Sequence, residues 1–240
     1  GCSVKEEQKE NCSDEMKITH AVDLSKEDGA DSVERDGDQK ESPYFKHPDF
    51  YNMKSTSTLT LLPKFKTIQQ TSEWSCGVDS ALMVLQYYGK LGEYNEETLA
   101  QFRTNKLKSE ATSLKSMIQI FEGVGGFKIH STYDYKESEY EKISLSMIQD
   151  YLKKGIPVMV AWNDWGGHWQ VIIGYDTMGT ETTQDDVLIV ADSYDTTDHN
   201  QDGYGIYPAE RFYYNWTMYD FFTKNYDVAE RDKLFIAVEP

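Results

Sequence analysis

After the N-terminal region, apolar residues recur at helical spacing in the first half of the remaining chain. They repeat every three to four positions from Val78 to Tyr88, and the pattern stops at Gly89. This spacing predicts a buried helix that begins at Cys76. Shorter patterns of the same kind, one of them preceded by the capping residue Asn95, predict further helices over about 95–104, 113–122 and 145–154.

The second half of the chain consists of short runs of β-branched and aromatic residues, bounded by Gly, Asp and Thr. Such runs favour strands, and we expect a short helix from about Pro208 to Trp216, since proline suits the first position of a helix. Helices that come first and strands that come second predict the α+β class, with helices packed against a twisted antiparallel sheet and a site between the two halves. The expected strands are 157–162, 168–175, 186–192 and 233–238.

Residues 1–42 differ from the rest of the chain in composition. They hold 13 Asp and Glu against 6 Lys and Arg, and every aromatic residue and every proline lies after them. A segment without large apolar side chains cannot bury enough surface to offset the entropy cost of ordering. We therefore expect an acidic disordered tether over 1–42 and one globular domain over 43–240.

Charge and hydropathy narrow the classes of function. The 240 residues include 24 Lys and Arg against 41 Asp and Glu, a net charge of −17, so no basic surplus can neutralise phosphates and a nucleic-acid partner is excluded. No apolar run of roughly 18 residues occurs, so we expect membrane contact only through an added anchor. Cys76 is the only cysteine after residue 42, which excludes an internal disulfide framework in the domain.

Cys2, followed by a polar and acidic stretch, resembles the start of a mature bacterial lipoprotein, in which this cysteine carries acyl chains. The resemblance implies an extracytoplasmic protein that is held at the bacterial cell membrane by a lipid anchor. The alternative is a truncated chain in which Cys2 has no special role. We expect Cys12 to be an unpaired thiol.

Cys76 stands where a cysteine is most reactive. A thiol attacks only as the thiolate, and a helix N-terminus favours the thiolate through about half a positive charge and free backbone N–H groups. Gln70, six residues upstream, can direct its side-chain amide to the same place. Together with the Cys76 backbone N–H it would form an oxyanion hole with two donors. The structural alternative is a core cysteine that opens an apolar helix.

A general base must come from elsewhere, and His168 is the best candidate of the five histidines, because it opens a predicted strand directly after two glycines. A hairpin centred near residue 180 would place Asp192 directly opposite His168. The carboxylate could then orient the imidazole and stabilise its charged form. Taken singly, His168 could instead be a strand-end histidine and Asp192 the start of a turn.

The stretches around these residues resemble the C39-like branch of the papain-like cysteine peptidases, over about residues 60–238. The likeness rests on Gln70-Thr-Ser-Glu-Trp-Ser-Cys76-Gly77, Gly167-His168-Trp-Gln-Val-Ile-Ile-Gly174 and Val190-Ala-Asp192. It implies a papain-like fold with four assigned roles: Cys76 as nucleophile, His168 as base, Asp192 as orienting acid and Gln70 as oxyanion donor.

Two departures from the family limit what can be carried over. True C39 members are fused to transporters and cut leader peptides after a double glycine, whereas this sequence shows no transporter segment, so that substrate is not assigned here. The C39-like relatives commonly have proline after the aspartate, whereas Ser193 follows Asp192 here. We expect this change to affect the turn more than the chemistry.

The resulting hypothesis is an extracytoplasmic cysteine peptidase that hydrolyses a peptide or isopeptide bond of a peptide or protein through an acyl-enzyme, with no cofactor required. One alternative is an acyltransferase or transglutaminase-like enzyme with the same triad, and another is a catalytically silent module that binds a cell-envelope peptide. For substrate contacts we expect Trp165 above all, with Trp74 beside it and Gly167 leaving room for the ligand.

One further motif concerns calcium. Asp198, Asn200 and Asp202 followed by Gly203 match the first positions of an EF-hand loop, but position 12 is Ala209 instead of an acid. The alternative is an acidic turn whose side chains bind local backbone. No metal is expected in the active site itself, because Cys76 and His168 belong to no short ligand cluster.

Overall fold

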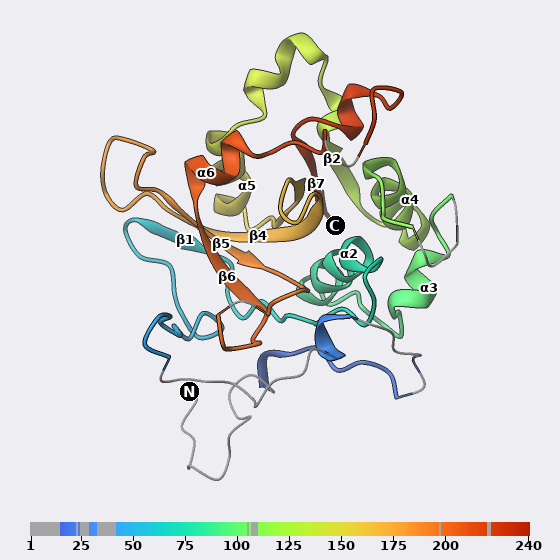
Figure 1. Cartoon of the computed structure of the whole chain (residues 1–240), viewed down its shortest axis with the longest axis horizontal. Helices are drawn as coiled ribbons and strands as arrows, with labels where there is room; N and C mark the ends of the chain where they lie inside the picture. The colour runs from blue at the N-terminus through green and yellow to red at the C-terminus, as the bar shows by residue number, and fades with distance from the viewer. Residues whose placement is uncertain are drawn as a thin grey trace.

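The computed structural model describes residues 15–22, 24, 29–32, 42–104, 106, 110–196, 198–219 and 222–240. Within them, seven strands form one antiparallel sheet in the order β2-β7-β3-β4-β5-β6, and β1 also pairs with β4 (Figure 1). The strands are β1 Leu59–Leu61, β2 Lys128–Ser131, β3 Val158–Trp162, β4 His168–Asp176, β5 Val187–Ala191, β6 Tyr204–Pro208 and β7 Leu234–Glu239.

The helices lie around this sheet. The central helix α2 packs against β4, α4 packs against β7, and α5 packs against β1, β3 and β4 (Figure 1). The α-helices are α2 Cys76–Tyr87, α3 Glu96–Ala100, α4 Leu114–Val124, α5 Leu145–Lys153 and α6 Ala209–Tyr214. The 3-10 helices are η1 Ala30–Ser32, η2 Thr132–Asp134, η3 Glu137–Lys142 and η4 Val228–Glu230. The α+β class predicted from the order of the elements is confirmed.

The helix predictions are confirmed in place, and the sequence explains their ends. Asn95 caps α3 by accepting a hydrogen bond from the Thr98 backbone N–H, and α2 ends just before Gly89, which has a positive φ of 70°. The short helix predicted to begin at Pro208 begins one residue later. Pro208 still pairs with Val187 as the last residue of β6, so it caps α6 instead of opening it.

The four predicted strands are present as β3, β4, β5 and β7, whereas β1, β2 and β6 were not predicted. β1 has only three residues, and β2 lies at one edge of the sheet with its outer residues half-exposed. β6 forms the other edge, where exposed residues leave no long apolar run in the sequence. Short edge strands owe their structure to their neighbours more than to a local pattern.

The predicted register of the β4–β5 hairpin is wrong. A hairpin centred near residue 180 would pair Val171 with Ile189, whereas Val171 pairs with Ala191 in the structure. The pairing then shifts between Ile172 and Gly174, where a bulge inserts one residue on β4. The centre of the hairpin therefore lies later in the chain than predicted, because the loop geometry and the bulge set the register and the apolar pattern alone does not.

Parts of the first 42 residues lie against the domain. The Ile18 backbone N–H donates to the Thr67 carbonyl at 2.7 Å, and Thr67 N–H donates to the Met16 carbonyl at 3.0 Å. Met16, Leu24 and Ala30 are buried. For these residues a solvated tail is the wrong description, because single apolar side chains in an acidic stretch still find contacts. Cys2, Cys12 and residues 33–41 lie outside the described residues, and for them the tether, and the boundary at residue 42, stay predictions.

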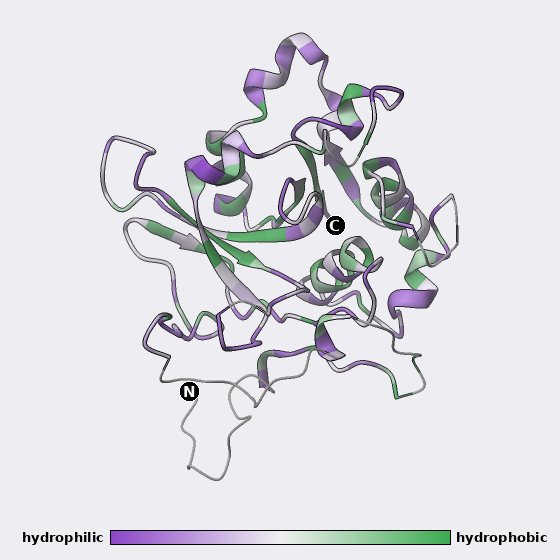
Figure 2. Ribbon diagram, in the orientation of Figure 1, coloured by the Kyte–Doolittle hydropathy of each residue, from purple (hydrophilic) through white to green (hydrophobic). Residues whose placement is uncertain are grey.

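Hydrophobic residues follow the strands and the inner sides of the helices, and hydrophilic residues dominate the surrounding loops (Figure 2). The first ten residues of α2, Cys76 to Leu85, are all buried, so α2 runs through the core. In the part of the chain that the structure describes, no helix combines the length and the apolar character needed to span a bilayer. Because its first ten residues are buried and it packs on β4, the start of α2 is held against the sheet.

Candidate active site

Four sequence-predicted residues line one cavity of about 220 Å³: Gln70, Cys76, His168 and Asp192. Cys76 is the first residue of α2 and is 8% exposed. His168 is the first residue of β4, and Asp192 directly follows β5. The central helix, whose apolar face packs on β4, therefore brings its N-terminus to the end of the strand that supplies the histidine.

The carboxylate of Asp192 is held at both oxygens. His168 Nε2 donates to Asp192 Oδ1 at 2.7 Å, and the Tyr194 backbone N–H donates to the same oxygen at 2.9 Å. Gln170 Nε2 donates to Asp192 Oδ2 at 2.9 Å. Because Nε2 of the imidazole is engaged by Asp192, Nδ1 is the nitrogen left for the thiol of Cys76, which lines the same cavity.

The contact between His168 and Asp192 forms although the two residues are not opposite each other. Ala191 pairs with Val171, so the next residue, Asp192, comes level with Gln170 and not with His168. The carboxylate reaches across the ladder and binds both side chains, which point to the same face of β4 because they are two residues apart. The predicted partner was right and the predicted register was wrong.

Electrostatics favour a charged pair at this site. Burial by itself lowers the pKa of His168, but the charge of Asp192 and the hydrogen bonds to Asp192 and Cys76 outweigh burial and raise the pKa well above its ordinary value. Burial raises the pKa of Asp192, but the charge and hydrogen bond of His168 and the bonds from Tyr194 and Gln170 bring it below its ordinary value. Imidazolium facing carboxylate is thus the favoured state.

The side chain of Gln70 is fixed beside Cys76 by Ser193. The Ser193 hydroxyl donates to Gln70 Oε1 at 2.8 Å, and the Gln70 backbone N–H donates to the Ser193 carbonyl at 2.8 Å. Gln70 Nε2 donates one hydrogen to the Ser72 carbonyl at 2.7 Å, and an amide nitrogen has a second hydrogen to offer. Ser193, which we expected to affect mainly the turn, therefore also orients the candidate oxyanion donor.

Several residues of the site were missed by the sequence analysis. Gln170 and Ser193 are described above, and Gln69 Nε2 donates to the Asp192 carbonyl at 3.0 Å while its Oε1 accepts from the Asp195 backbone N–H. The alternation of a strand could have identified Gln170, because it shares a face with His168. Glu73 and Tyr194 also line the cavity, and no local pattern points to them; Asp164 lines it as well and could be expected near the site only from its place shortly before His168 in the sequence.

The predicted substrate contacts divide into two groups. Trp165 lines the cavity and is 67% exposed, and Gly167 lines it as well. Trp74 is buried and does not line the cavity; its ring lies 5.2 Å from the guanidinium carbon of Arg103. Trp74 therefore packs inside the protein beside Arg103, and its contact with substrate stays a prediction.

The acidic loop after β5 brings together a different set from the one predicted for calcium. Carboxylate oxygens of Asp195, Asp198 and Asp202 lie within 4.8 Å of one another. Asn200 presents its amide nitrogen to this group, since Nδ2 donates to Asp202 Oδ2 at 3.3 Å. Burial, and then the charges of Asp198 and Asp202, raise the pKa of Asp195 well above its ordinary value. Calcium binding, and the expectation of no metal in the active site, stay predictions.

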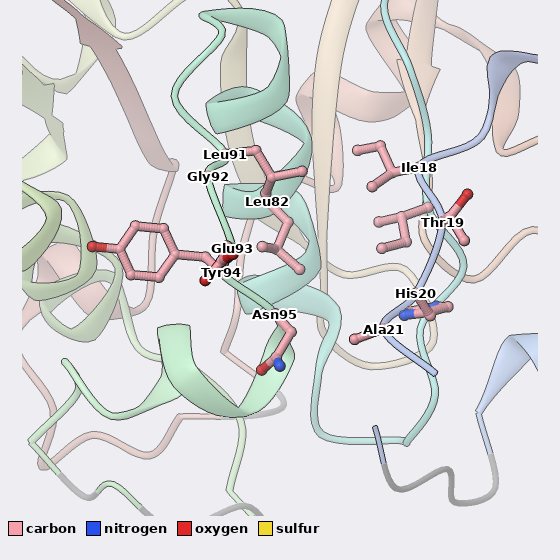
Figure 3. Close-up of a pocket in the computed structure, with 11 residues that line it drawn as sticks. Ile18, Thr19, His20, Ala21, Leu82, Leu91, Gly92, Glu93, Tyr94 and Asn95 are labelled. Atoms are coloured by element: carbon pink, nitrogen blue, oxygen red, sulfur yellow. The ribbon is translucent and has the colours of Figure 1, made fainter. Parts of the chain in front are cut away.

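A larger cavity lies beside α2 and contains none of the four predicted catalytic residues. It measures about 350 Å³ and is lined by Ile18 and His20 of the N-terminal stretch, Leu82 of α2, and residues 91–95 (Figure 3). Its lining offers no thiol and shares no residue with the cavity around Cys76. Cavity size therefore does not locate the chemistry, whereas the convergence of titratable side chains does.

A comparison with known proteins agrees with the geometry. Residues 63–223 match the Peptidase_C39 like family, and the chain therefore belongs to this family. The resemblance inferred from Gln70 to Gly77 and from Gly167 to Asp192 is confirmed, and the structure has the α+β class that it implies.

The solved structure of UfSP from C. elegans is similar, with a TM-score of 0.45 and 12% sequence identity. The match covers 79% of this chain and 35% of UfSP, so this chain spans about a third of the length of that protein. None of the curated proteins matches the chain.

Proposed function

We propose that this protein is a cysteine peptidase that hydrolyses a peptide or isopeptide bond through an acyl-enzyme. The observation that carries the proposal is the convergence of Asp192, His168 and Cys76 on one cavity, in which His168 Nε2 donates to Asp192 Oδ1. An acid that orients an imidazole beside a thiol at a helix N-terminus is the arrangement that nucleophilic acyl transfer requires.

In this proposal the Cys76 thiolate attacks the scissile carbonyl carbon, and a sulfur–carbon bond forms. The oxyanion is stabilised by the Cys76 backbone N–H and the second hydrogen of Gln70 Nε2. The His168 imidazolium gives its proton to the leaving amine, the carbon–nitrogen bond breaks, and a thioester remains. His168 then takes a proton from water, which attacks the thioester and releases the carboxylic acid and Cys76.

Two other functions share parts of this site. An amine can attack the same thioester, which would make the protein an acyltransferase or transglutaminase-like enzyme. A silent peptide-binding module would use only the cavity and its aromatic wall. The retained set of Gln70, Cys76, His168 and Asp192 in hydrogen-bonding positions supports chemistry over silent binding.

The test is labelling of the full chain with iodoacetamide near pH 7, with the modified residue located by mass spectrometry. We expect wild type to be alkylated fastest at Cys76, and Cys76→Ala, which keeps Cys2 and Cys12, to lose this fast phase and all cleavage of a peptide library. His168→Ala should slow the alkylation at Cys76, because the imidazolium that stabilises the thiolate is removed.

Equal labelling of wild type and Cys76→Ala would reject the nucleophile. Adding a primary amine during cleavage separates the two chemistries. Products that carry the amine in place of the new carboxylate would favour acyl transfer over hydrolysis.

We also propose an extracytoplasmic location with a lipid on Cys2. Support comes from the resemblance of Cys2 and the following polar, acidic stretch to mature lipoproteins. The precursor and its Cys2→Ser variant, expressed in bacteria, should partition differently between membrane and soluble fractions. Identical partitioning would reject lipidation.

A further inference from the structure

Two carboxylates that the proposed mechanism does not use line the cavity around Cys76. Glu73 comes from the loop before α2, and Asp164 comes from the loop between β3 and β4. Asp164 offers an oxygen within 4.8 Å of a ring nitrogen of His168. Asp192 is the third acid of the lining, and none of the described lining residues is Lys or Arg.

The cation that lies near Asp164 is the His168 imidazolium, which is already paired with Asp192. Exposed Glu73 accepts a hydrogen bond at Oε1 from the Tyr194 hydroxyl at 3.0 Å. Asp164 is half-buried, and burial raises its pKa although the charge of His168 opposes the rise. Among the described ion pairs, none joins either acid to Lys or Arg. A positive charge brought into this cavity from outside would be attracted by both carboxylates that line it.

An aromatic wall stands beside the two acids. The Trp165 ring centroid lies 5.0 Å from that of Tyr194, and Trp165 is 67% exposed. Its backbone has a positive φ of 54°, an uncommon conformation for a residue with a side chain. The face of an exposed indole attracts ammonium and guanidinium groups. The aromatic wall and the two acids therefore both favour a ligand group with a positive charge.

We propose that this cavity selects peptides with a Lys or Arg side chain next to the scissile bond, bound by Glu73 and Asp164 and covered by Trp165. The inference rests on the proposed peptidase function and adds to it the chemical class of the substrate. The net charge of −17 acts in the same direction, because it draws basic peptides toward the protein at low ionic strength.

The experiment uses the full-length protein and internally quenched peptides of one neutral sequence, in which a single lysine is moved along the positions. Each peptide has two matched partners, with norleucine or glutamate in place of the lysine. We expect cleavage next to the lysine, with kcat/KM about tenfold or more above the norleucine peptide and the glutamate peptide slowest. A charge-assisted hydrogen bond contributes enough free energy for a factor of this size.

The lysine-to-norleucine ratio of kcat/KM is then measured in variants. Glu73→Gln and Asp164→Asn should each lower the ratio about threefold to tenfold, and Glu73→Lys should shift the preference toward glutamate. Glu122→Gln, an exposed acid of α4 outside the cavity, is the matched control and should keep the wild-type ratio. A ratio within one variant cancels any general loss of activity, including a loss caused by Asp164 acting on His168.

A wild-type ratio near one, or a ratio unchanged in both Glu73→Gln and Asp164→Asn, would overturn the inference. Iodoacetamide labelling of Cys76 separates this failure from a failure of the proposed function. Fast labelling and cleavage without a preference for lysine reject the basic subsite alone. Absence of both labelling and cleavage rejects the peptidase and the subsite together.

Discussion

Ser193 connects the two halves of the candidate site. Its hydroxyl donates to Gln70 Oε1, and its carbonyl accepts from the Gln70 backbone N–H. In the chain, Ser193 directly follows Asp192. Both Gln70 and Ser193 are almost completely buried, so the orientation of the Gln70 amide is set by this donor and not by water. The residue that replaces the proline common in the family thus couples the orienting acid to the oxyanion donor.

At the residue scale we predict that Ser193→Ala lowers kcat about twofold to tenfold, since Gln70 Oε1 then lacks its buried donor and the amide is less well oriented. The rate of Cys76 alkylation by iodoacetamide should stay at the wild-type value, because the thiol and the imidazole are not touched. Steady-state kinetics and alkylation rates together make the measurement. An unchanged kcat would contradict the positioning role, and an equal loss in both rates would indicate general damage.

At the scale of elements, the loop before α2 is held by the N-terminal region. The Gln70 carbonyl accepts from the Asp31 backbone N–H at 3.2 Å, and the Gln69 carbonyl bonds with His20 Nε2 at 2.6 Å. Gly29 approaches so closely that a Cβ there would lie 2.2 Å from the Thr71 carbonyl carbon. The loop that carries the oxyanion donor is thus fixed from the N-terminal side as well as by Ser193.

We predict that Gly29→Ala displaces this contact and lowers kcat, because the added methyl group meets backbone that cannot rotate away. The matched control is Gly205→Ala in β6, where a Cβ would lie 3.6 Å from the nearest atom, an ordinary contact. Amide hydrogen exchange over residues 67–72 should accelerate in Gly29→Ala and stay unchanged in Gly205→Ala. Equal exchange and equal kcat in both variants would show that the N-terminal contact does not support the loop.

At the scale of the whole molecule, the protein buries acids despite its net charge of −17. Asp79, one turn after Cys76 in α2, is fully buried. Burial, the charge of Glu96, and then the charges of Cys76 and Asp31 raise the pKa of Asp79 well above its ordinary value. Glu96 in turn accepts from the Thr71 backbone N–H at 3.0 Å, so this acidic pair lies directly behind the loop of the site.

The sign of the resulting pH dependence follows from the raised pKa of Asp79. The folded state keeps the proton of Asp79 at pH values where the unfolded state has lost it. The free energy of unfolding therefore decreases as the pH rises from the ordinary carboxyl pKa near 3.8 through the raised pKa of the folded state. Because of Asp79, the free energy of unfolding should be larger in mild acid than at neutral pH.

We predict that Asp79→Asn raises the melting temperature near neutral pH and changes it little near pH 4, because the amide fills the buried position without a charge at either pH. Each kcal/mol gained corresponds to about 2–4 °C for a protein of this size. Melting curves at both pH values, with exposed Asp150→Asn on α5 as control, make the measurement. A melting temperature lowered equally at both pH values would show that Asp79 acts as a charged group.

Local patterns predicted much of this fold and site in advance. The apolar spacing from Val78 to Tyr88 placed α2, and the position of Cys76 at its start followed from the residues alone. The β-branched runs predicted β3, β4, β5 and β7, because strands buried on both faces carry a continuous apolar signal. The identities of Cys76, His168, Asp192 and Gln70 as one group came from residue chemistry together with the family resemblance.

The sequence by itself determined the class of fold, the central helix and the reactive side chains, since these depend on periodicity and residue type within a short stretch of chain. Only the tertiary structure decided which side chains meet: Gln170 level with Asp192, Ser193 on Gln70, and Glu73 with Asp164 beside Cys76. The physical reason is that register, bulges and loop packing arise from contacts between distant segments, and no local pattern encodes those contacts.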